Sequence, residues 1–259
     1  MDYDIGAGIL KLIDHTMLTP YSSENKIEGL VDEGEAFGAY GICVLPVYAG
    51  VARQRIKYAG CKLRLAAVVD FPFGGETSAN RVEEVKALGA VADEVDVVIQ
   101  IGLLKSMKYG EVGRDLNDVS AAAHSKGMLL KVIIETAYLS MHEKMKACEI
   151  VFGSGADFIK TSTGFADPRF SSRIGNALTG ATEDDIRMMA EISERVGKKN
   201  VGIKASGGIR TYEQAVSLLR ASAREPNPNS FRIGTSSTGA IAKEIEVRMK
   251  EYRDNCSKK

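Results

Sequence analysis

Short apolar segments rich in β-branched residues alternate with helix-like segments eight times along this chain, which strongly limits its possible folds. Such alternation predicts a parallel sheet, and eight units indicate a closed (β/α)8 TIM barrel of the α/β class. An open doubly wound sheet remains possible, because counting units does not prove closure. The Gly-rich first turn of a dinucleotide-binding unit is missing near the N-terminus, which weighs against that alternative. The predicted strands are Leu12–Thr16, Gly41–Pro46, Leu63–Asp70, Glu94–Ile99, Met128–Glu135, Asp157–Thr161, Val201–Ala205 and Phe231–Gly234.

Helices are expected between these strands, with a further short helix before the first one. No linker or repeat divides the sequence, so we expect a single domain over residues 1–259. The predicted helices are Ser22–Tyr40, Tyr48–Ala59, Thr77–Leu88, Tyr109–Lys126, Met141–Gly153, Glu183–Val196, Tyr212–Arg224 and Thr238–Arg253.

One connection, residues 166–182 with the sequence ADPRFSSRIGNALTGAT, is longer than the few residues usual after a barrel strand. Loops of this length at the carboxyl ends of strands are often lids or binding loops. A surface insertion without a role explains the length equally well, so the sequence leaves both interpretations open.

The overall charge gives no support for binding to nucleic acids or to a membrane surface, because 34 basic residues balance 34 acidic ones. The four cysteines are scattered and form no CxxC pair, which is typical of reduced thiols in a cytosolic protein. The first ten residues, MDYDIGAGIL, do not resemble a signal peptide, and no segment is apolar enough to span a membrane. We therefore expect a cytoplasmic protein.

Ionisable side chains interrupt five of the predicted strands, although a strand of a parallel barrel is buried on both faces and should be nearly all apolar. Two acids and three lysines in such places predict a polar cluster inside the barrel. A buried ion-pair network that only sets specificity is the alternative. The residues concerned are Asp14 with His15, Asp96, Lys131, Lys160 and Lys204.

Lys160 lies in the segment GADFIKTSTGF, at the end of an apolar run and just before a small polar turn. A buried ammonium is costly, and a lysine that loses its charge there becomes a nucleophile toward carbonyl groups. The alternative is a lysine with a buried stem whose head reaches water. Two neighbouring lysines lower each other's pKa, and a carboxylate with a water can move protons at carbon. This set suits imine and enamine chemistry. No histidine or cysteine spacing indicates a metal site.

Two small turns follow the last two predicted strands, SGGIR at Ser206–Arg210 and GTSS at Gly234–Ser237. Turns of this kind after the seventh and eighth strands form the common phosphate site of such barrels. Their glycines let backbone N–H groups approach an anion, and the following helix adds a favourable dipole. Each turn alone could be an ordinary loop, but the pair predicts a phosphate site.

Seven motifs together resemble those of the deoxyribose-phosphate aldolases, a class I aldolase family that needs no metal or other cofactor. They occur in the family's order across nearly the whole chain, and KTSTG followed by KxSGGIR is highly specific. The motifs are IDHTML (Ile13–Leu18), FPFG (Phe71–Gly74), DEVDVVI (Asp93–Ile99), LLKVIIET (Leu129–Thr136), GADFIKTSTGF (Gly155–Phe165), VGIKASGGIRT (Val201–Thr211) and RIGTSS (Arg232–Ser237).

The resemblance implies a (β/α)8 barrel that reversibly cleaves 2-deoxy-D-ribose 5-phosphate to acetaldehyde and D-glyceraldehyde 3-phosphate. It implies that Lys160 forms the Schiff base, that Lys204 helps to keep it uncharged and relays protons, that Asp96 activates a water, and that Lys131 supports the relay. It also implies self-association as a dimer or tetramer. The implied substrate-binding residues are Asp14, Thr16, Thr163, Gly164, Gly207, Gly208, Ser236 and Ser237.

The chain departs from the family pattern at several places, which puts phosphate affinity in question. Phe165 stands where some relatives have a phosphate-binding lysine, and Asp70 stands where glycine is frequent. The C-terminal NCSKK lacks the terminal tyrosine of some members. Arg169 and Arg173 in the long loop are candidates to replace the missing charge.

Two other functions fit the same residues. One is a class I aldolase that acts on a different aldehyde or keto acid, and the other is a sugar-phosphate-binding barrel without catalytic activity. Covalent trapping of acetaldehyde on Lys160 distinguishes the binder from either enzyme.

Overall fold

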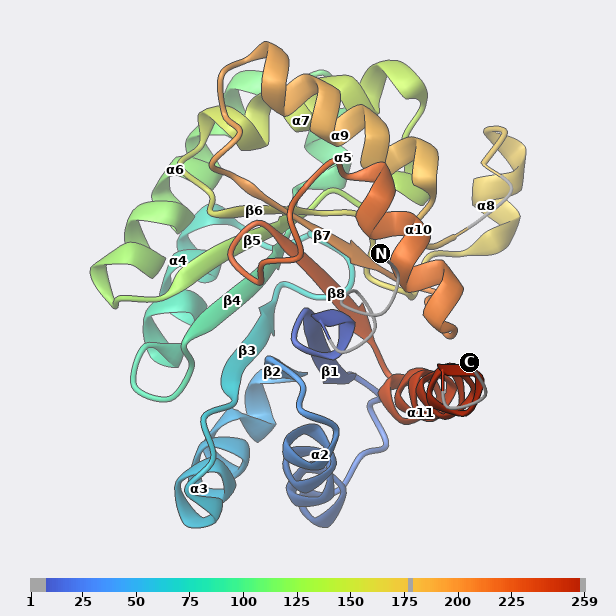
Figure 1. The fold of residues 1–259 in the computed structure, drawn as a ribbon. Coiled ribbons are helices and arrows are strands. Elements are labelled where there is room, and N and C mark those ends of the chain that lie inside the picture. Colours follow the sequence, from blue (N-terminus) through green and yellow to red (C-terminus); the bar gives the residue numbers. More distant parts are fainter. Residues whose placement is uncertain (1–7, 177–178, 257–259) are drawn as a thin grey trace.

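Eight parallel strands form a closed barrel in the computed structural model, which describes residues 8–176 and 179–256. Each strand pairs with the next one along the chain, and β1 pairs with β8 to close the ring (Figure 1). The predicted TIM barrel is therefore confirmed, and the open sheet is excluded. The strands are β1 (Ile13–Met17), β2 (Gly41–Val44), β3 (Arg64–Val69), β4 (Glu94–Val98), β5 (Leu129–Ile133), β6 (Phe158–Lys160), β7 (Gly202–Ser206) and β8 (Phe231–Thr235).

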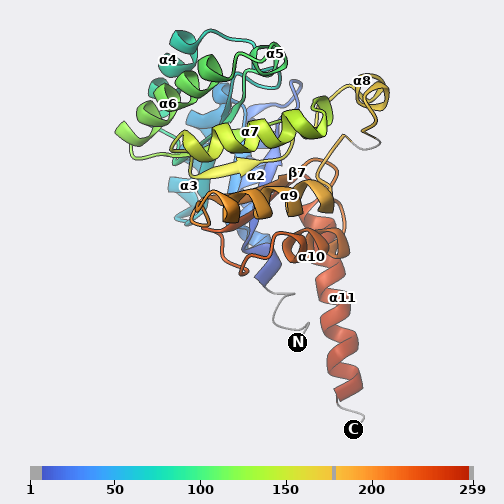
Figure 2. The same cartoon turned by 90° about the horizontal axis from the view of Figure 1, so that it is seen from above.

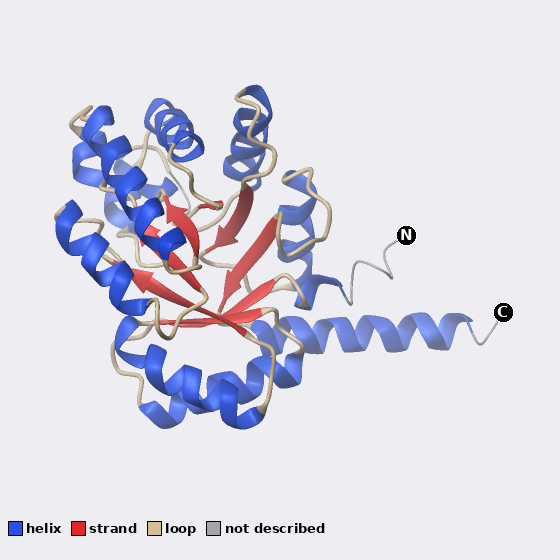
Figure 3. Cartoon of the chain, turned by 90° about the vertical axis from the view of Figure 1, so that its left-hand side faces the viewer, coloured by secondary structure: helices blue, strands red, loops and turns tan. Residues whose placement is uncertain are grey.

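The helices surround the strands, and α11 extends beyond the barrel toward the C-terminus (Figures 2 and 3). None of the described helices is long and apolar enough to cross a membrane. The helices are α2 (Glu24–Phe37), α3 (Ala49–Ala59), α4 (Ser78–Leu88), α5 (Ile101–Lys105), α6 (Tyr109–Ser125), α7 (Met141–Gly153), α8 (Pro168–Arg173), α9 (Glu183–Arg195), α10 (Tyr212–Ala221) and α11 (Thr238–Cys256), with 3-10 turns η1 (Pro46–Tyr48) and η2 (Thr136–Tyr138).

Some predicted boundaries differ from the observed ones for local backbone reasons. The strands expected to reach Asp70 and Glu135 end earlier, because both residues adopt a left-handed backbone, with φ of 49° and 52°. Two segments expected to be loops contain the short helices α5 and α8. The short helix expected before β1 is helical at residues 8–10, and residues 1–7 lie outside the described chain.

The apolar core has two parts. The larger part packs the outward faces of the strands against the helices, and a small second cluster comprises Leu18, Cys43, Ala66 and Val68. The register pairs Cys43 with Ala66, and Val68 with Asp96, whose carboxylate bonds Lys204 of β7, so this cluster lies inside the barrel. The barrel interior is thus apolar beside β2 and β3, whereas its charged groups come from the other strands, β1 included.

A glycine in β7 makes room for the neighbouring strand's aromatic ring. Gly202 is paired in register with Phe158, and a Cβ on Gly202 would collide with that ring. Phe158 is buried, so the ring has little space to move.

We predict that Gly202→Ala lowers the free energy of unfolding by about 1–3 kcal/mol, because the added methyl overpacks the barrel. Gly29→Ala in helix α2 is the matched control, because a Cβ there meets nothing within 4 Å. The control should raise stability by about 0.5–1 kcal/mol through helix propensity. Urea unfolding measures both, and equal effects would contradict the packing argument.

Candidate functional site

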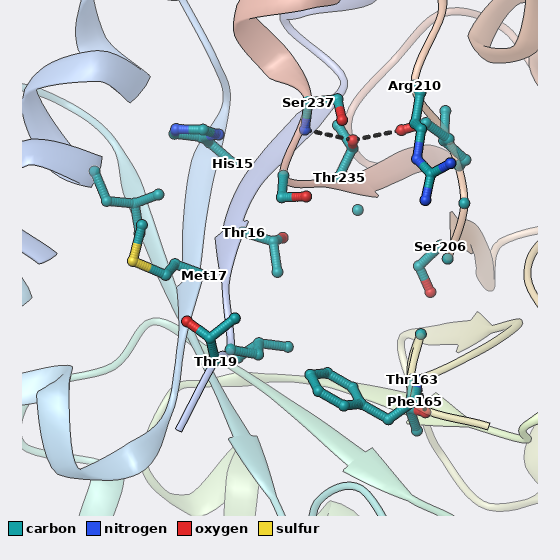
Figure 4. A pocket seen from close by; sticks show the side chains of 18 of the residues that line it. His15, Thr16, Met17, Thr19, Thr163, Phe165, Ser206, Arg210, Thr235 and Ser237 are labelled. Carbon is teal, nitrogen blue, oxygen red and sulfur yellow. Dashed lines mark hydrogen bonds between the residues drawn. The ribbon is translucent and has the colours of Figure 1, made fainter. Parts of the chain in front are cut away.

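A cavity of about 390 Å³ opens at the carboxyl ends of the strands (Figure 4). Its walls come from β1 and from the turns after β6, β7 and β8. Lys160 lines the cavity, together with Thr16, Thr163, Gly164, Phe165, Ser206, Gly207, Gly208, Arg210, Ser236 and Ser237. Seven of the eight substrate-binding residues expected from the sequence therefore line this one cavity.

Three glycines with left-handed backbones form one wall of this cavity. Gly164 has φ of 87°, Gly207 of 89° and Gly208 of 76°, which side-chain-bearing residues rarely adopt. A Cβ on Gly164 would lie 3.9 Å from the Cα of Gly207, so the two turns approach each other closely. Helix α11 starts at Thr238, directly after Ser236 and Ser237. Exposed backbone and a helix N-terminus are a favourable place for a phosphate.

Hydroxyl groups tie these turns to one another. The Ser206 hydroxyl donates to the carbonyl of Ser162 at 2.5 Å, which joins the turns after β7 and β6. The Thr235 hydroxyl donates to the carbonyl of Ile209 at 2.6 Å and accepts the N–H of Ser237 at 2.9 Å (Figure 4). The geometry of the cavity wall is therefore fixed before any ligand binds.

Three lysines converge on one carboxylate beneath the cavity. The ammonium groups of Lys160 and Lys204 both donate to Oδ2 of Asp96 at 2.8 Å, and Lys131 donates to Oδ1 at 2.7 Å. Lys160 and Lys204 thus point to the same side of the wall, into the barrel, within two hydrogen-bond lengths of each other. Lys131 and Lys204 are fully buried, and Lys160 is 3% exposed. The alternative of a lysine head that reaches bulk water is therefore wrong for Lys160.

Asp14 lies in the same buried cluster and not on the cavity wall. One of its oxygens accepts from Lys204 at 2.5 Å, and the other accepts from Arg232 at 2.7 Å. The nearby Thr16 hydroxyl donates to the backbone carbonyl of Asp14 and does line the cavity. Of these two expected substrate-binding residues, Thr16 lines the cavity and Asp14 does not.

The charged forms of Asp96, Lys204 and Lys131 are favoured despite complete burial. Burial by itself raises the pKa of Asp96, but the three lysines outweigh it and hold that pKa well below the ordinary value. Burial likewise lowers the pKa of Lys204, but Asp14 and Asp96 outweigh it and raise that pKa. The pKa of Lys131 is raised in the same way by Asp96 and Glu94. Lys204 and Lys131 are therefore firmly cationic neighbours of Lys160.

Several residues of the site were not assigned a role from the sequence. Arg210 lines the cavity beside the glycine turns, and Glu94 and Arg232 belong to the buried cluster. Glu94 precedes Asp96 by two positions, so the two-residue period of a strand could have indicated a shared face. Arg232 lies at the start of the RIGTSS motif, two positions before the turn that predicts a phosphate site.

Glu135 is a further residue without an assigned role, and it fastens the turn that follows Lys160. Its Oε2 accepts hydrogen bonds from both the N–H and the hydroxyl of Thr163, while its Oε1 is buried without a partner. Burial raises the pKa of Glu135, even though the bonds from Thr163 lower it. The Thr163 hydroxyl in turn accepts the N–H of Phe165, so these hydrogen bonds extend from Glu135 to the edge of the cavity.

The long loop after β6 is attached to the rest of the protein at two places in its second half. The Asn176 amide donates to the carbonyls of Thr136, Ala137 and Leu139 at 3.0–3.2 Å, and the N–H of Ala181 donates to Gly207 at 3.1 Å. Positions 177 and 178 lie outside the described residues. The loop therefore flanks the glycine wall.

Neither arginine expected to replace a missing phosphate charge lines the cavity. Arg169 is exposed and pairs with Asp167 in its own helix, and Arg173 is exposed at the end of that helix. Arg210 is the arginine among the residues that line the cavity. Arg210, and not Arg169 or Arg173, thus places a positive charge near the glycines of the cavity wall.

The two departures at Asp70 and Phe165 have visible structural partners. The Asp70 carboxylate accepts the N–H groups of Gly75 and Glu76 and closes its own turn. Phe71, the next residue, packs edge-to-face against Phe165 with ring centroids 5.5 Å apart. Asp70 therefore shapes the segment whose aromatic side chain supports the apolar edge of the cavity.

In residues 8–176 and 179–256, no group of three or more histidine, cysteine, aspartate or glutamate side chains is arranged to hold a metal ion. The carboxylates of the cluster are instead occupied by lysine and arginine. Cys43 is buried beside the cluster, and burial raises the pKa of its thiol to about 11. The arrangement therefore offers amines and a carboxylate as its reactive groups.

Comparison with known proteins relates this chain to aldolases. Residues 9–241 match the DeoC/LacD family aldolases. The chain is 40% identical over 238 residues to the deoxyribose-phosphate aldolase of Thermoplasma volcanium, covering 92% of this chain and 94% of the relative. It is 43% identical over 234 residues to the deoxyribose-phosphate aldolase of Thermococcus gammatolerans, covering 90% and 94%.

Solved structures give the same relationship. The aldolase QR15 superposes with a TM-score of 0.78 at 34% identity, covering 93% of this chain and 97% of the other. A tetrameric deoxyribose phosphate aldolase from Aeropyrum pernix superposes with a TM-score of 0.77 at 26% identity, covering 93% and 92%.

The buried lysines should make the protein sensitive to alkali. A lysine whose folded pKa is raised contributes its full stability below its unfolded pKa of about 10.4 and loses it as the pH rises through the folded value. We predict that the free energy of unfolding falls above about pH 10.4, by about 1.4 kcal/mol per pH unit for each of Lys131 and Lys204. Urea unfolding at a series of pH values measures the slope.

The exposed pair of Lys199 and Glu194 provides the control for this measurement. Lys199→Gln should leave the alkaline slope unchanged, because a solvated surface pair contributes little. A wild-type stability that stays constant to about pH 11.5 would show that the buried lysines carry no such linkage.

Proposed function

Because this chain belongs to the DeoC/LacD family of aldolases, we propose that it reversibly cleaves 2-deoxy-D-ribose 5-phosphate to acetaldehyde and D-glyceraldehyde 3-phosphate. The observation that carries the proposal is the position of Lys160. Its amine lies at the floor of a cavity walled by glycine turns and shares a carboxylate with Lys204. An imine-forming amine below a phosphate-binding wall is what this substrate requires.

The first step joins Lys160 to the substrate. The uncharged Nζ attacks the aldehyde carbon, C1, and the resulting carbinolamine loses water to give an iminium ion. The cation at Lys204 lies beside the attacking amine, because both nitrogens contact the same Asp96 oxygen. Lys204 also provides a proton for the departing hydroxyl, and its bonds to Asp14 and Asp96 hold it in place.

The second step breaks the bond between C2 and C3. A base removes the proton of the C3 hydroxyl, the C2–C3 electron pair moves into the iminium ion, and glyceraldehyde 3-phosphate leaves. The enamine on Lys160 then gains a proton at C2, and water hydrolyses the imine to release acetaldehyde. Asp96 lies within hydrogen-bond reach of Lys160, which supports its assignment, acting through a water, as the group that moves protons at C2. Lys131 holds the other Asp96 oxygen.

The phosphate is assigned to the glycine wall. Gly164, Gly207 and Gly208 leave backbone N–H groups accessible, and Ser236 and Ser237 precede the N-terminus of α11. Thr163 and Thr16 line the same cavity, where they are in reach of sugar hydroxyls. Asp14 acts in this proposal from below, through Lys204, because both its oxygens are already occupied.

We further propose that the protein is a cytoplasmic homo-oligomer, a dimer or a tetramer. The name of the Aeropyrum pernix relative, which describes a tetramer, supports self-association in this family. Light scattering on the purified protein measures the number of subunits directly.

Borohydride trapping with acetaldehyde tests the covalent step. Reduction of the imine should leave one ethyl group on the peptide that contains Lys160, and Lys160→Met should abolish both the adduct and cleavage of the sugar phosphate. Lys144 is the internal control, because it is also buried and paired with a carboxylate, Asp185, but lies in helix α7. An unmodified Lys160 would indicate a sugar-phosphate binder, and activity on other aldol substrates alone would indicate a different aldolase.

Arg210 should contribute to recognition of the phosphate. We predict that Arg210→Ala raises the KM for 2-deoxy-D-ribose 5-phosphate by about 10-fold or more, as the loss of a charge-assisted hydrogen bond would. Cleavage of unphosphorylated 2-deoxyribose should stay unchanged. Arg169→Ala is the control, because Arg169 is exposed and paired with Asp167. A larger effect at Arg169 than at Arg210 would reverse the assignment.

A further inference from the structure

Six buried charges inside the barrel form a closed ring of ion pairs in which the sign alternates. The ring runs through Asp96, Lys131, Glu94, Arg232, Asp14 and Lys204 and returns to Asp96. The successive donor–acceptor distances are 2.7, 2.6, 2.9, 2.7, 2.5 and 2.8 Å. We call this set the charge ring. None of its members is more than 1% exposed.

The charge ring is electrically balanced, because it contains three carboxylates and three cations. Lys160 is a seventh charge, and its ammonium donates to the Asp96 oxygen that Lys204 already uses. When Lys160 is protonated, the ring and Lys160 together carry one more cation than anions. An uncompensated charge of this kind is costly in a buried site. Loss of the Lys160 proton removes that excess without breaking the ring.

Glu94 and Arg232 form the part of the ring that lies farthest from the cavity. Each lies two positions before a residue nearer the carboxyl end of its strand, where the cavity opens: Glu94 before Asp96 in β4, and Arg232 before Gly234 in β8. The Arg232 guanidinium bridges two acids, with Nη1 on Asp14 and Nη2 on Glu94, and it stacks on Tyr40 at 3.7 Å from the ring centroid. The planar guanidinium thus spans the two acids as a fork, with one terminal nitrogen on each.

Resting on the imine chemistry proposed above, we infer that Glu94 and Arg232 are positioning residues that set which lysine reacts. By completing the charge ring, they keep Lys131 and Lys204 as cations and leave Lys160 as the amine that gives up its proton. They do so from beneath the site, without contact with the substrate. The residues that line the cavity do not include either of them.

Other titratable groups face the ring, and none of them supplies a matching charge. Cys43 from β2 is a neutral thiol whose pKa is raised by burial. Arg64 from β3 lies 3.9 Å from Glu94, but it is partly exposed and also faces Asp93. Glu135, after β5, is bound to Thr163 and interacts electrostatically with Lys160, but burial outweighs both and raises its pKa, which favours the uncharged acid. Tyr40 contributes its ring face to Arg232. The charge count within the barrel therefore rests on the ring and Lys160.

The test is the pH dependence of borohydride trapping by acetaldehyde at Lys160 in two variants of the full chain. Arg232→Met removes a cation, so Lys160 is no longer in excess, and the midpoint of trapping should rise by about one pH unit. Glu94→Gln removes an anion, so the midpoint should fall by a similar amount or a second lysine should become trapped. Shifts of opposite sign are expected from charge balance and not from a loss of packing.

Arg232→Lys and Glu94→Asp are the matched controls, because they keep each charge while changing its shape. Their trapping midpoints should stay within about half a pH unit of the wild type, even if turnover falls. Shifts of the same sign in both charge-removing variants, or unshifted midpoints, would overturn the inference. Circular dichroism checks that each variant folds. If a charge-removing variant does not fold, a shift of a full pH unit in the trapping midpoint of either control overturns the inference instead. A wild type that traps no acetaldehyde would contradict the proposed function itself.

Discussion

Asp96 is the carboxylate on which the interior of this barrel depends, because it accepts hydrogen bonds from three lysines at once. Three buried ammonium groups so close together would repel strongly in a site that excludes water. Asp96 offsets part of this repulsion directly, and Glu94 and Asp14 offset the rest through Lys131 and Lys204. The result is a polar centre that is stable only as a set, in which each member of the charge ring has at least two partners.

Hydrogen bonds connect the turns that line the cavity to the strands that carry the charged centre. The strand that ends in Lys160 continues into the turn of Thr163 and Gly164, and Glu135 fastens that turn from the segment after the neighbouring strand β5. Ser206 then links the β6 turn to the β7 turn by its bond to Ser162. A phosphate held on the glycine wall would therefore be positioned relative to the reactive amine by hydrogen bonds that exist without ligand. This pre-organisation reduces the entropy that binding must overcome.

Much of the fold was predictable, because each strand carries its own local signal. The eight apolar segments and the helices between them were recognisable one by one, and the closed barrel and the aldolase family are both confirmed. The errors occurred where a few residues change the backbone locally. Asp70 and Glu135 end strands through left-handed backbones, and the short helix α8 lies in a segment without clear periodicity. Such features depend on tertiary contacts that a single sequence window does not contain.

The sequence by itself determined which reactive groups this protein has and on which strands they lie. Lys160, Lys204, Asp96 and the two glycine turns were all recognisable, because each breaks an apolar pattern or carries a distinctive motif. Only the tertiary structure decided how these groups share their charges. That Arg232 reaches Asp14 across 218 positions, and Glu94 across 138, follows from the closure of β8 onto β1 and from the register of the strands. Electrostatic balance depends on distances in space, which no spacing along the chain records.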